Sequence, residues 1–236
     1  MTQLDAEQRH SSNPPPPRVR DDVAYILPMA IYLAFLQIGA WWPSIYPATY
    51  VARVIAVAAA LVLLWRYYTP ISWRYWWLGA IVGVIGIFQW VPMQLWLQRN
   101  VAFFAPSGEP FDPTQVFAES DAMLYGFLAF RIIGAVLVVP VMEELFWRDF
   151  LWRQILAPND FKLAEVGERA WAPFLIVSLV FAFVHGNWWL TSIVWALMIG
   201  GLLVYTKSLG ACIVAHAVTN LLLAVYVLKY RDWAFW

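Results

Sequence analysis

The sequence predicts an all-α membrane protein, a polytopic transmembrane helical bundle with seven or eight spans. Of the 236 residues, 62% are hydrophobic and only 13% are charged, a composition that no water-soluble domain of this length needs. Several apolar stretches also reach about 20 residues, the length with which a helix crosses the hydrocarbon of a bilayer. Lys and Arg, finally, concentrate in alternate connections between these stretches, as in membrane proteins of fixed orientation.

The first segment, residues 1–22, is polar and contains four consecutive prolines, Pro14 to Pro17. This composition predicts a disordered cytoplasmic tail with a stiff linker, and a polyproline recognition motif is the alternative. The segment lacks the short basic lead of a cleaved signal peptide. We expect residues 23–236 to form a single transmembrane helical domain.

Seven apolar segments then follow in order, and an acidic, proline-rich loop from Gln98 to Asp121 separates the third from the fourth. Pro140 interrupts the fourth segment and predicts a kink there, with a small polar cavity beside it, because proline cannot donate a backbone hydrogen bond. The count is seven spans, or eight if Pro140 splits the fourth segment. The predicted segments are Val23 to Trp42, Tyr50 to Tyr68, Tyr75 to Leu97, Met123 to about Leu156, Trp171 to Trp188, Leu190 to Tyr205 and Leu209 to Leu228.

The basic residues predict the orientation. They lie before the first segment, between the second and third, and after the fourth, which places the N-terminus in the cytoplasm. Lys229 and Arg231 at the far end favour the same side, which eight spans allow and seven forbid.

The remaining composition excludes some functions and predicts packing roles. The formal net charge is zero, from 15 basic and 15 acidic residues, so nothing favours a nucleic-acid partner. Cys212 lies in an apolar run and is expected to be a small buried residue. The 16 tryptophans predict an interfacial belt, with ligand stacking as the alternative. Gly79 and Gly83 are expected to let another helix approach closely.

The stretch VVPVMEELFWRDF, from Val138 to Phe150, places four ionisable groups inside an apolar segment. An unpaired charge in hydrocarbon costs several kcal/mol, so such residues are candidates for function. Glu144 and Arg148 are spaced i, i+4 and are expected to pair on one helix face. Glu143 points about 100° away and has no partner in the local sequence.

Two histidines lie in later apolar segments, each with a companion one helical turn away. Phe181 precedes His185 by four residues and is expected to pack over its imidazole, and Asn220 follows His216 by four residues on the same face. Amide hydrolysis would use all these groups, with Glu143 taking a proton from the attacking water. His216 and Asn220 would offer N–H donors to the oxyanion, and His185 would orient the water or carry its proton. Polar contacts between helices are the alternative role for any one of these residues.

The three patterns together resemble the motifs of the CAAX-protease and bacteriocin-processing family of intramembrane proteases. They are E-E-x-x-x-R at Glu143, Glu144 and Arg148, F-x-x-x-H at Phe181 and His185, and H-x-x-x-N at His216 and Asn220. The resemblance covers a core of about residues 121–226. It implies a glutamic-type endopeptidase in which Glu143 activates water with help from His185, His216 and Asn220 hold the oxyanion, and Glu144 and Arg148 support the site. It also implies a membrane-associated protein or peptide as the substrate.

The closing stretch from His216 to Trp236 further resembles a bacterial branch found alongside exosortase protein-sorting systems. That branch implies a bacterial inner membrane, a possible sorting-system partner and substrates without prenyl groups.

Three other classes stay open. A zinc protease could use the same glutamates and histidines as ligands, although H-E-x-x-H is absent, so no cofactor is expected. A transporter could use the buried charges as a proton relay, although no internal repeat relates the two halves of the chain. A non-catalytic scaffold or bacteriocin-immunity protein is the main rival.

Overall fold

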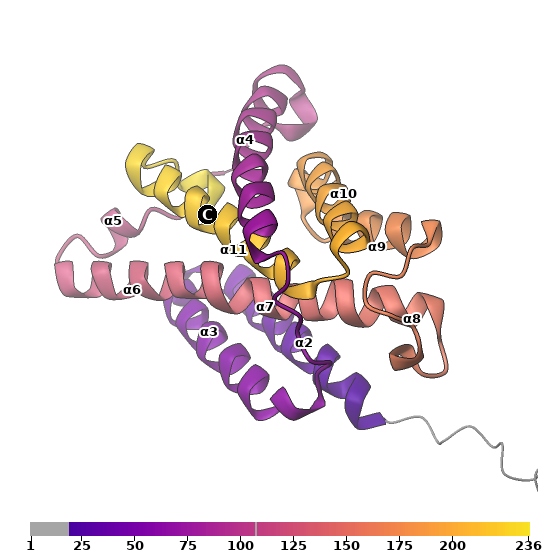
Figure 1. Cartoon of the computed structure of the whole chain (residues 1–236). Coiled ribbons are helices and arrows are strands. Elements are labelled where there is room, and N and C mark those ends of the chain that lie inside the picture. Colours follow the sequence, from indigo (N-terminus) through magenta and orange to yellow (C-terminus); the bar gives the residue numbers. More distant parts are fainter. Residues whose placement is uncertain (1–18, 107) are drawn as a thin grey trace, which may run out of the picture.

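A computed structural model describes residues 19–106 and 108–236, and within them the chain is helical and contains no strand (Figure 1). The predicted all-α class is therefore confirmed for this part of the chain. Most of the predicted tail, including His10 and Pro14 to Pro17, lies outside the described residues. The first described helix begins at Val19, four residues before the predicted domain boundary.

The helices alternate with short turns of 3-10 helix. Their bounds are α2 Val19–Trp41, α3 Tyr46–Leu63, α4 Trp76–Asn100, α5 Pro113–Val116, α6 Asp121–Ile133, α7 Val139–Glu144, α8 Trp152–Leu156, α9 Trp171–Phe183, α10 Trp189–Thr206 and α11 Leu209–Tyr230. The 3-10 turns are Pro43–Ile45, Trp65–Tyr67, Ala102–Phe104, Phe161–Leu163, Gly186–Trp188 and Trp233–Phe235.

The fourth apolar segment is one continuous helix of 36 residues, Asp121–Leu156. Two π-helical stretches, Gly134–Val138 and Leu145–Leu151, join α6, α7 and α8 into this single helix. Pro140 therefore does not split this segment, which was the alternative that would have given eight spans. A π turn pairs each carbonyl with the N–H five residues later instead of four, and this wider register accommodates the proline without ending the helix.

Six helices in the described residues are long and apolar enough to cross a membrane. The predicted count of seven to eight spans is higher than this number, mainly because of the fifth predicted segment, which was expected to run from Trp171 to Trp188. In the structure α9 ends at Phe183 after 13 residues, or about 20 Å, whereas the hydrocarbon is about 30 Å thick.

The long helix divides the bundle. In Figure 1, the hairpin of α2 and α3 lies on one side of it, and α4, α9, α10 and α11 lie on the other. Helices α4 and α11 approach very closely, since a Cβ atom added at Gly79 would lie 2.2 Å from the carbonyl oxygen of Ala211. Gly83 faces Ala215 and Val218 in the same way. The predicted packing role of these two glycines is confirmed.

Contacts between connections define the two ends of the bundle. At the first end, Lys162 Nζ donates to Asp21 Oδ2 and to the carbonyl oxygen of Tyr67, both at 2.8 Å. Lys207 pairs with Glu165 at the same end. The N-terminus of α2, the end of α3 and the connections before α9 and after α10 therefore meet there.

The second end contains the N-terminal part of α3, α6, the turn after α9 and the final 3-10 turn. There the ring of Trp188 packs on that of Phe235 at 4.9 Å, and Arg131 donates to the hydroxyl of Tyr46. The chain thus runs between the ends in alternate directions, and its last residues lie at the end opposite the N-terminus of α2.

Candidate active site

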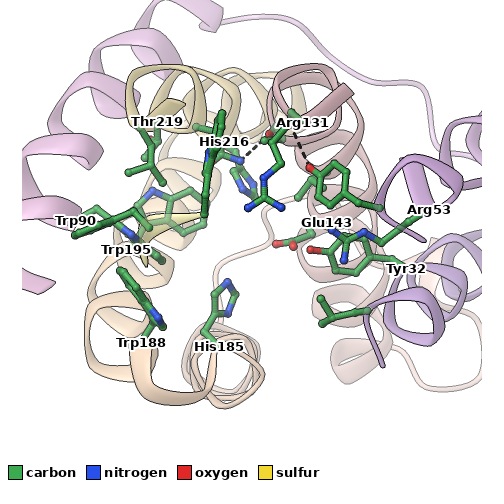
Figure 2. A pocket seen from close by; sticks show the side chains of 18 of the residues that line it. Tyr32, Arg53, Trp90, Arg131, Glu143, His185, Trp188, Trp195, His216 and Thr219 are labelled. Carbon is green, nitrogen blue, oxygen red and sulfur yellow. Dashed lines mark hydrogen bonds between the residues drawn. The ribbon is translucent and has the colours of Figure 1, made fainter. Parts of the chain in front are cut away.

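One cavity of about 480 Å³ lies between the α2–α3 hairpin, the long helix and the helices on its other side. It contains all four residues for which a catalytic role is predicted, because its lining includes Glu143, His185, His216 and Asn220. Phe181 lines it as well. Figure 2 shows the side chains of Glu143, His185 and His216 directed toward the same space from three different helical segments. Residues more than 70 positions apart in sequence therefore share one site.

The π turn before Glu143 positions Asn220. In π register, the carbonyl oxygen of Ala135 would accept from the N–H of residue 140, but that residue is proline and has none. Asn220 Nδ2 donates to this oxygen at 2.7 Å instead. Pro140 thus leaves a backbone acceptor that orients Asn220, whose second amide hydrogen remains for the cavity.

Glu143 lines the cavity and has a carboxylate oxygen without a partner among the described residues. Its side chain is buried, with 8% exposed, and its Oε2 atom has no hydrogen-bond partner among the described residues. It forms no ion pair there either. A buried carboxylate oxygen without a partner is rare in folded proteins and indicates a group that binds something from outside the chain.

His185 is fixed by its own helix. Its Nδ1 lies 2.6 Å from the carbonyl oxygen of Phe181, and its ring packs on the Phe181 ring with centroids 4.3 Å apart. The predicted packing of Phe181 is confirmed. Because a carbonyl only accepts, Nδ1 carries the proton, and in the neutral ring Nε2 is left as an acceptor. That nitrogen can accept a hydrogen bond from a water molecule in the cavity.

Glu144 is fully buried and joins two other residues. Its Oε1 atom accepts from Arg148 Nη1 at 3.2 Å, which confirms the predicted pair, and from His216 Nδ1 at 2.9 Å. The second contact was not predicted, since it links the first motif to the third across 72 residues. With Nδ1 committed to Glu144, only Nε2 of His216 faces other groups, and it donates when the ring is doubly protonated.

Aromatic rings close the site around these charges. The guanidinium of Arg148 lies 4.7 Å from the centroid of Phe181 and 5.4 Å from that of Trp195. Trp195 also packs edge-on against His216 at 4.7 Å. The cation is thereby held by π faces as well as by Glu144.

The shortness of α9 explains how His185 comes to line the same cavity as Glu143. Counted from the first end of the bundle, α9 rises about 20 Å before it ends, and Glu143 lies about 20 Å from Leu156 along the long helix. A helix of full span length would carry its last residues beyond that depth. The early end of α9 therefore places His185 level with the glutamate.

Sequence reasoning missed several residues of the cavity. Arg53 and Arg131 both line it, although each lies in an apolar segment where a lone charge is itself a signal of function. The tryptophans divide between two roles. Trp41, Trp76 and Trp171 are exposed, as an interfacial belt requires, whereas Trp90, Trp188, Trp195 and Trp236 line the cavity. Tyr32 and Tyr50 line it as well.

The side chains that could bind a metal ion do not gather at one place in the described residues. Across the part of the chain that the structure describes, no three His, Cys, Asp or Glu side chains come together as a metal-binding group. Cys212 is buried among apolar residues, as expected.

Residues 125–222 match a family model described as type II CAAX prenyl endopeptidase Rce1-like. The match supports the CAAX-protease family. It covers less than half of the chain, but it includes every motif residue from Glu143 to Asn220. The family is one of proteases, so the match supports hydrolysis of a peptide bond at the membrane. Searches of curated proteins and of solved structures gave no significant match.

Proposed function

We propose that this chain is a glutamic-type intramembrane endopeptidase that cleaves a membrane-associated protein or peptide. The observation that carries the proposal is the Glu143 carboxylate, which is buried, lacks a partner at Oε2 and shares a cavity with His185 and His216. This is the arrangement that activation of a water molecule requires, namely a free base with hydrogen-bonding groups around it.

In the first step, Glu143 takes a proton from a water molecule that His185 Nε2 orients. The oxygen of that water attacks the carbonyl carbon of the scissile bond, and the carbonyl oxygen becomes an oxyanion. His216 Nε2–H and the free N–H of Asn220 stabilise this charge. Glu144 supports the step because, as a carboxylate, it stabilises the imidazolium form that His216 needs in order to donate.

In the second step, the proton on Glu143 passes to the leaving amine, and the C–N bond breaks. The products are a new carboxylate and a new amine, and Glu143 returns to its starting form. No metal ion takes part in these steps, so we expect cleavage to survive exhaustive chelation. Complete loss of cleavage on chelation, restored by zinc, would favour the zinc protease instead.

The location of the protein is part of the same proposal. We place the chain in a bacterial inner membrane with its N-terminus in the cytoplasm, beside a protein-sorting system of the exosortase type. The first end of the bundle, where Lys162 and Lys207 lie, then faces the cytoplasm. The cavity lies nearer the opposite end, whose residues Trp188 and Trp236 contribute to its lining.

A survey of new protein termini tests the proposal. Membrane proteins from cells with the wild-type chain are compared with those from cells with Glu143→Gln, which keeps the shape of the side chain and removes the base. Glu119→Gln, an exposed glutamate outside the cavity, is the matched control. We expect termini that are present with the wild type and the control and absent with Glu143→Gln. Identical termini in all three strains would overturn the proposal and favour the scaffold.

A further inference from the structure

Two arginines of the cavity have no role in the steps above. Arg53 on α3 and Arg131 on α6 are each only 7% exposed, and both line the cavity. Neither forms an ion pair with a carboxylate within residues 19–106 and 108–236. Arginine stays charged at any accessible pH, so each contributes a permanent buried cation.

Aromatic rings hold these two cations without neutralising them. Arg53 lies 4.6 Å from the ring centroid of Tyr32 and 4.5 Å from that of Tyr50. Arg131 lies 4.6 Å from the same Tyr50 ring and 5.2 Å from the Trp236 ring. One tyrosine ring thus brings both guanidiniums to one part of the cavity. Arg131 also donates to the hydroxyl of Tyr46, and most of the other N–H donors of the two arginines have no partner among the described residues.

The charges around the cavity do not balance. Glu144 is occupied by Arg148 and His216, so among the described residues Glu143 is the one acid that lines the cavity, against the two guanidiniums. Two buried cations with a single nearby anion are costly in low dielectric, unless a ligand supplies further negative charge. This unbalanced positive charge favours an anionic ligand in the cavity.

The cavity also has two chemically different sides. In Figure 2, Trp90, Trp188 and Trp195 gather on one side, Arg53 and Tyr32 lie on the other, and the carboxylate of Glu143 stands between them. A ligand that fits both sides has an apolar part and an anionic part. Its middle would lie at Glu143.

We propose, on the basis of the proposed function, that Arg53 and Arg131 form a subsite that binds a carboxylate of the peptide substrate. The planar guanidinium fork matches a carboxylate with two parallel hydrogen bonds, and such charge-assisted bonds fix position as well as affinity. The carboxylate is the C-terminal one or an acidic side chain near the cleaved bond. Binding of this carboxylate determines which peptide bond of the substrate lies against Glu143, so the two arginines determine which bond is cleaved.

A binding measurement tests the subsite without any cleavage. The probes are N-acetyl-trileucine as the free acid, its C-terminal amide, and the same amide with glutamate as the last residue. Each is titrated against the purified full-length Glu143→Gln protein in detergent, with binding followed by the rise in melting temperature. We expect the protein to bind one or both of the carboxylate probes about 10- to 100-fold more tightly than the neutral amide. The stronger of the two identifies the source of the carboxylate.

Substitutions then assign the preference to the arginines. Arg53→Met and Arg131→Met should each remove most of the preference for the acid, and Arg53→Lys and Arg131→Lys should retain part of it. Arg99→Met, at an exposed arginine outside the cavity, should leave it unchanged. If the Glu143→Gln protein, which retains both arginines, binds all three probes equally, the proposed subsite is overturned. This result does not depend on whether the Met variants fold.

Two further results would also overturn it. Dioleoylphosphatidylglycerol that binds in an arginine-dependent manner, while the peptide acids do not, would make the site one for lipid phosphate. The second result is a cleavage rate that falls equally for acid and amide substrates in the arginine variants, with a shifted pH dependence of that rate. It would show that the arginines act on Glu143 and not on the substrate. Absence of cleavage with intact acid-selective binding would reject the proposed protease and leave the subsite standing.

Discussion

Two buried ion pairs of equal spacing follow each other on the long helix and differ in how completely they are bonded. In the Asp149–Arg153 pair, Asp149 also accepts from the hydroxyl of Tyr25 at 2.8 Å. Arg153 donates to three further oxygens, those of Thr69, Lys162 and Ala164. In the Glu144–Arg148 pair, Glu144 Oε2 and Arg148 Nη2 lack partners among the described residues.

From this difference we expect a structural role for the first pair and a functional role for the second. The saturated pair lies near the first end of the bundle, where it ties the long helix to α2 and to the connections around it. The unsaturated pair lies behind the cavity wall, where Glu144 contacts the lining residue His216, and its unpartnered donor and acceptor cost stability. Incomplete bonding, rather than the presence of charge, marks the site.

The largest loss of stability is expected from Asp149→Asn. This change leaves the Arg153 cation buried without its acid, which costs about 3–5 kcal/mol. The melting temperature of the purified protein in detergent should fall steeply, and cleavage should fall only as the folded fraction does. A melting temperature within error of the wild type would contradict the structural role of this pair.

Glu144→Gln should destabilise less and inactivate more. The amide still reaches Arg148, and the arginine keeps its contacts with Phe181 and Trp195, so we expect a loss of about 1–3 kcal/mol. Cleavage per folded molecule should fall strongly, because His216 loses the carboxylate that supports its charged form. Thermal denaturation together with rates normalised to folded protein measures both effects. An unchanged melting temperature with unchanged cleavage would remove Glu144 from the site.

Phe181→Leu tests the ring that serves both Arg148 and His185. Loss of the π face should cost about 0.5–1.5 kcal/mol, and cleavage should fall several-fold because the imidazole is less firmly held. Phe181→Tyr keeps the ring and should preserve the orientation of His185. Equal effects of the two changes, measured by melting temperature and rate, would show that bulk matters and the ring does not.

The smallest effect is expected at the exposed pair between Glu165 and Lys207. The hydrogen bond from Lys207 lowers the pKa of the Glu165 carboxyl, and the same contact raises the pKa of Lys207. A lowered folded pKa contributes stability above the usual glutamate range, which is lost as the pH falls through the folded value. Because the pair is exposed and screened, Glu165→Gln should leave the melting temperature at neutral pH nearly unchanged. A clear fall that salt does not reduce would contradict this ranking.

Local spacing explains what the sequence could predict. The pairs Glu144–Arg148 and Phe181–His185 lie four residues apart, so helix geometry alone brings them together, and the structure contains both contacts. Apolar length likewise predicted the helical class and most helix positions.

Long-range packing explains what it could not. The contact between Glu144 and His216 depends on how α11 crosses the long helix, and α11 is itself packed closely against α4 at Gly79 and Gly83. Arg53 and Arg131 are 78 positions apart and meet only at Tyr50, a contact that no periodicity records. The π turns were also beyond sequence reasoning, because proline signals a disturbed helix without specifying whether the helix kinks or widens.

The early end of α9 also bears on where the reaction obtains its water. Since α9 stops about 20 Å from the first end, roughly 10 Å of hydrocarbon thickness beyond it is not crossed by that helix. The cavity extends into this region, where Trp188 and Trp236 form part of its wall. Each turnover consumes one water molecule, and a vestibule open to the second face would supply it without passage through lipid. Water and substrate would then enter by separate routes, and hydrolysis would not require water to cross the lipid.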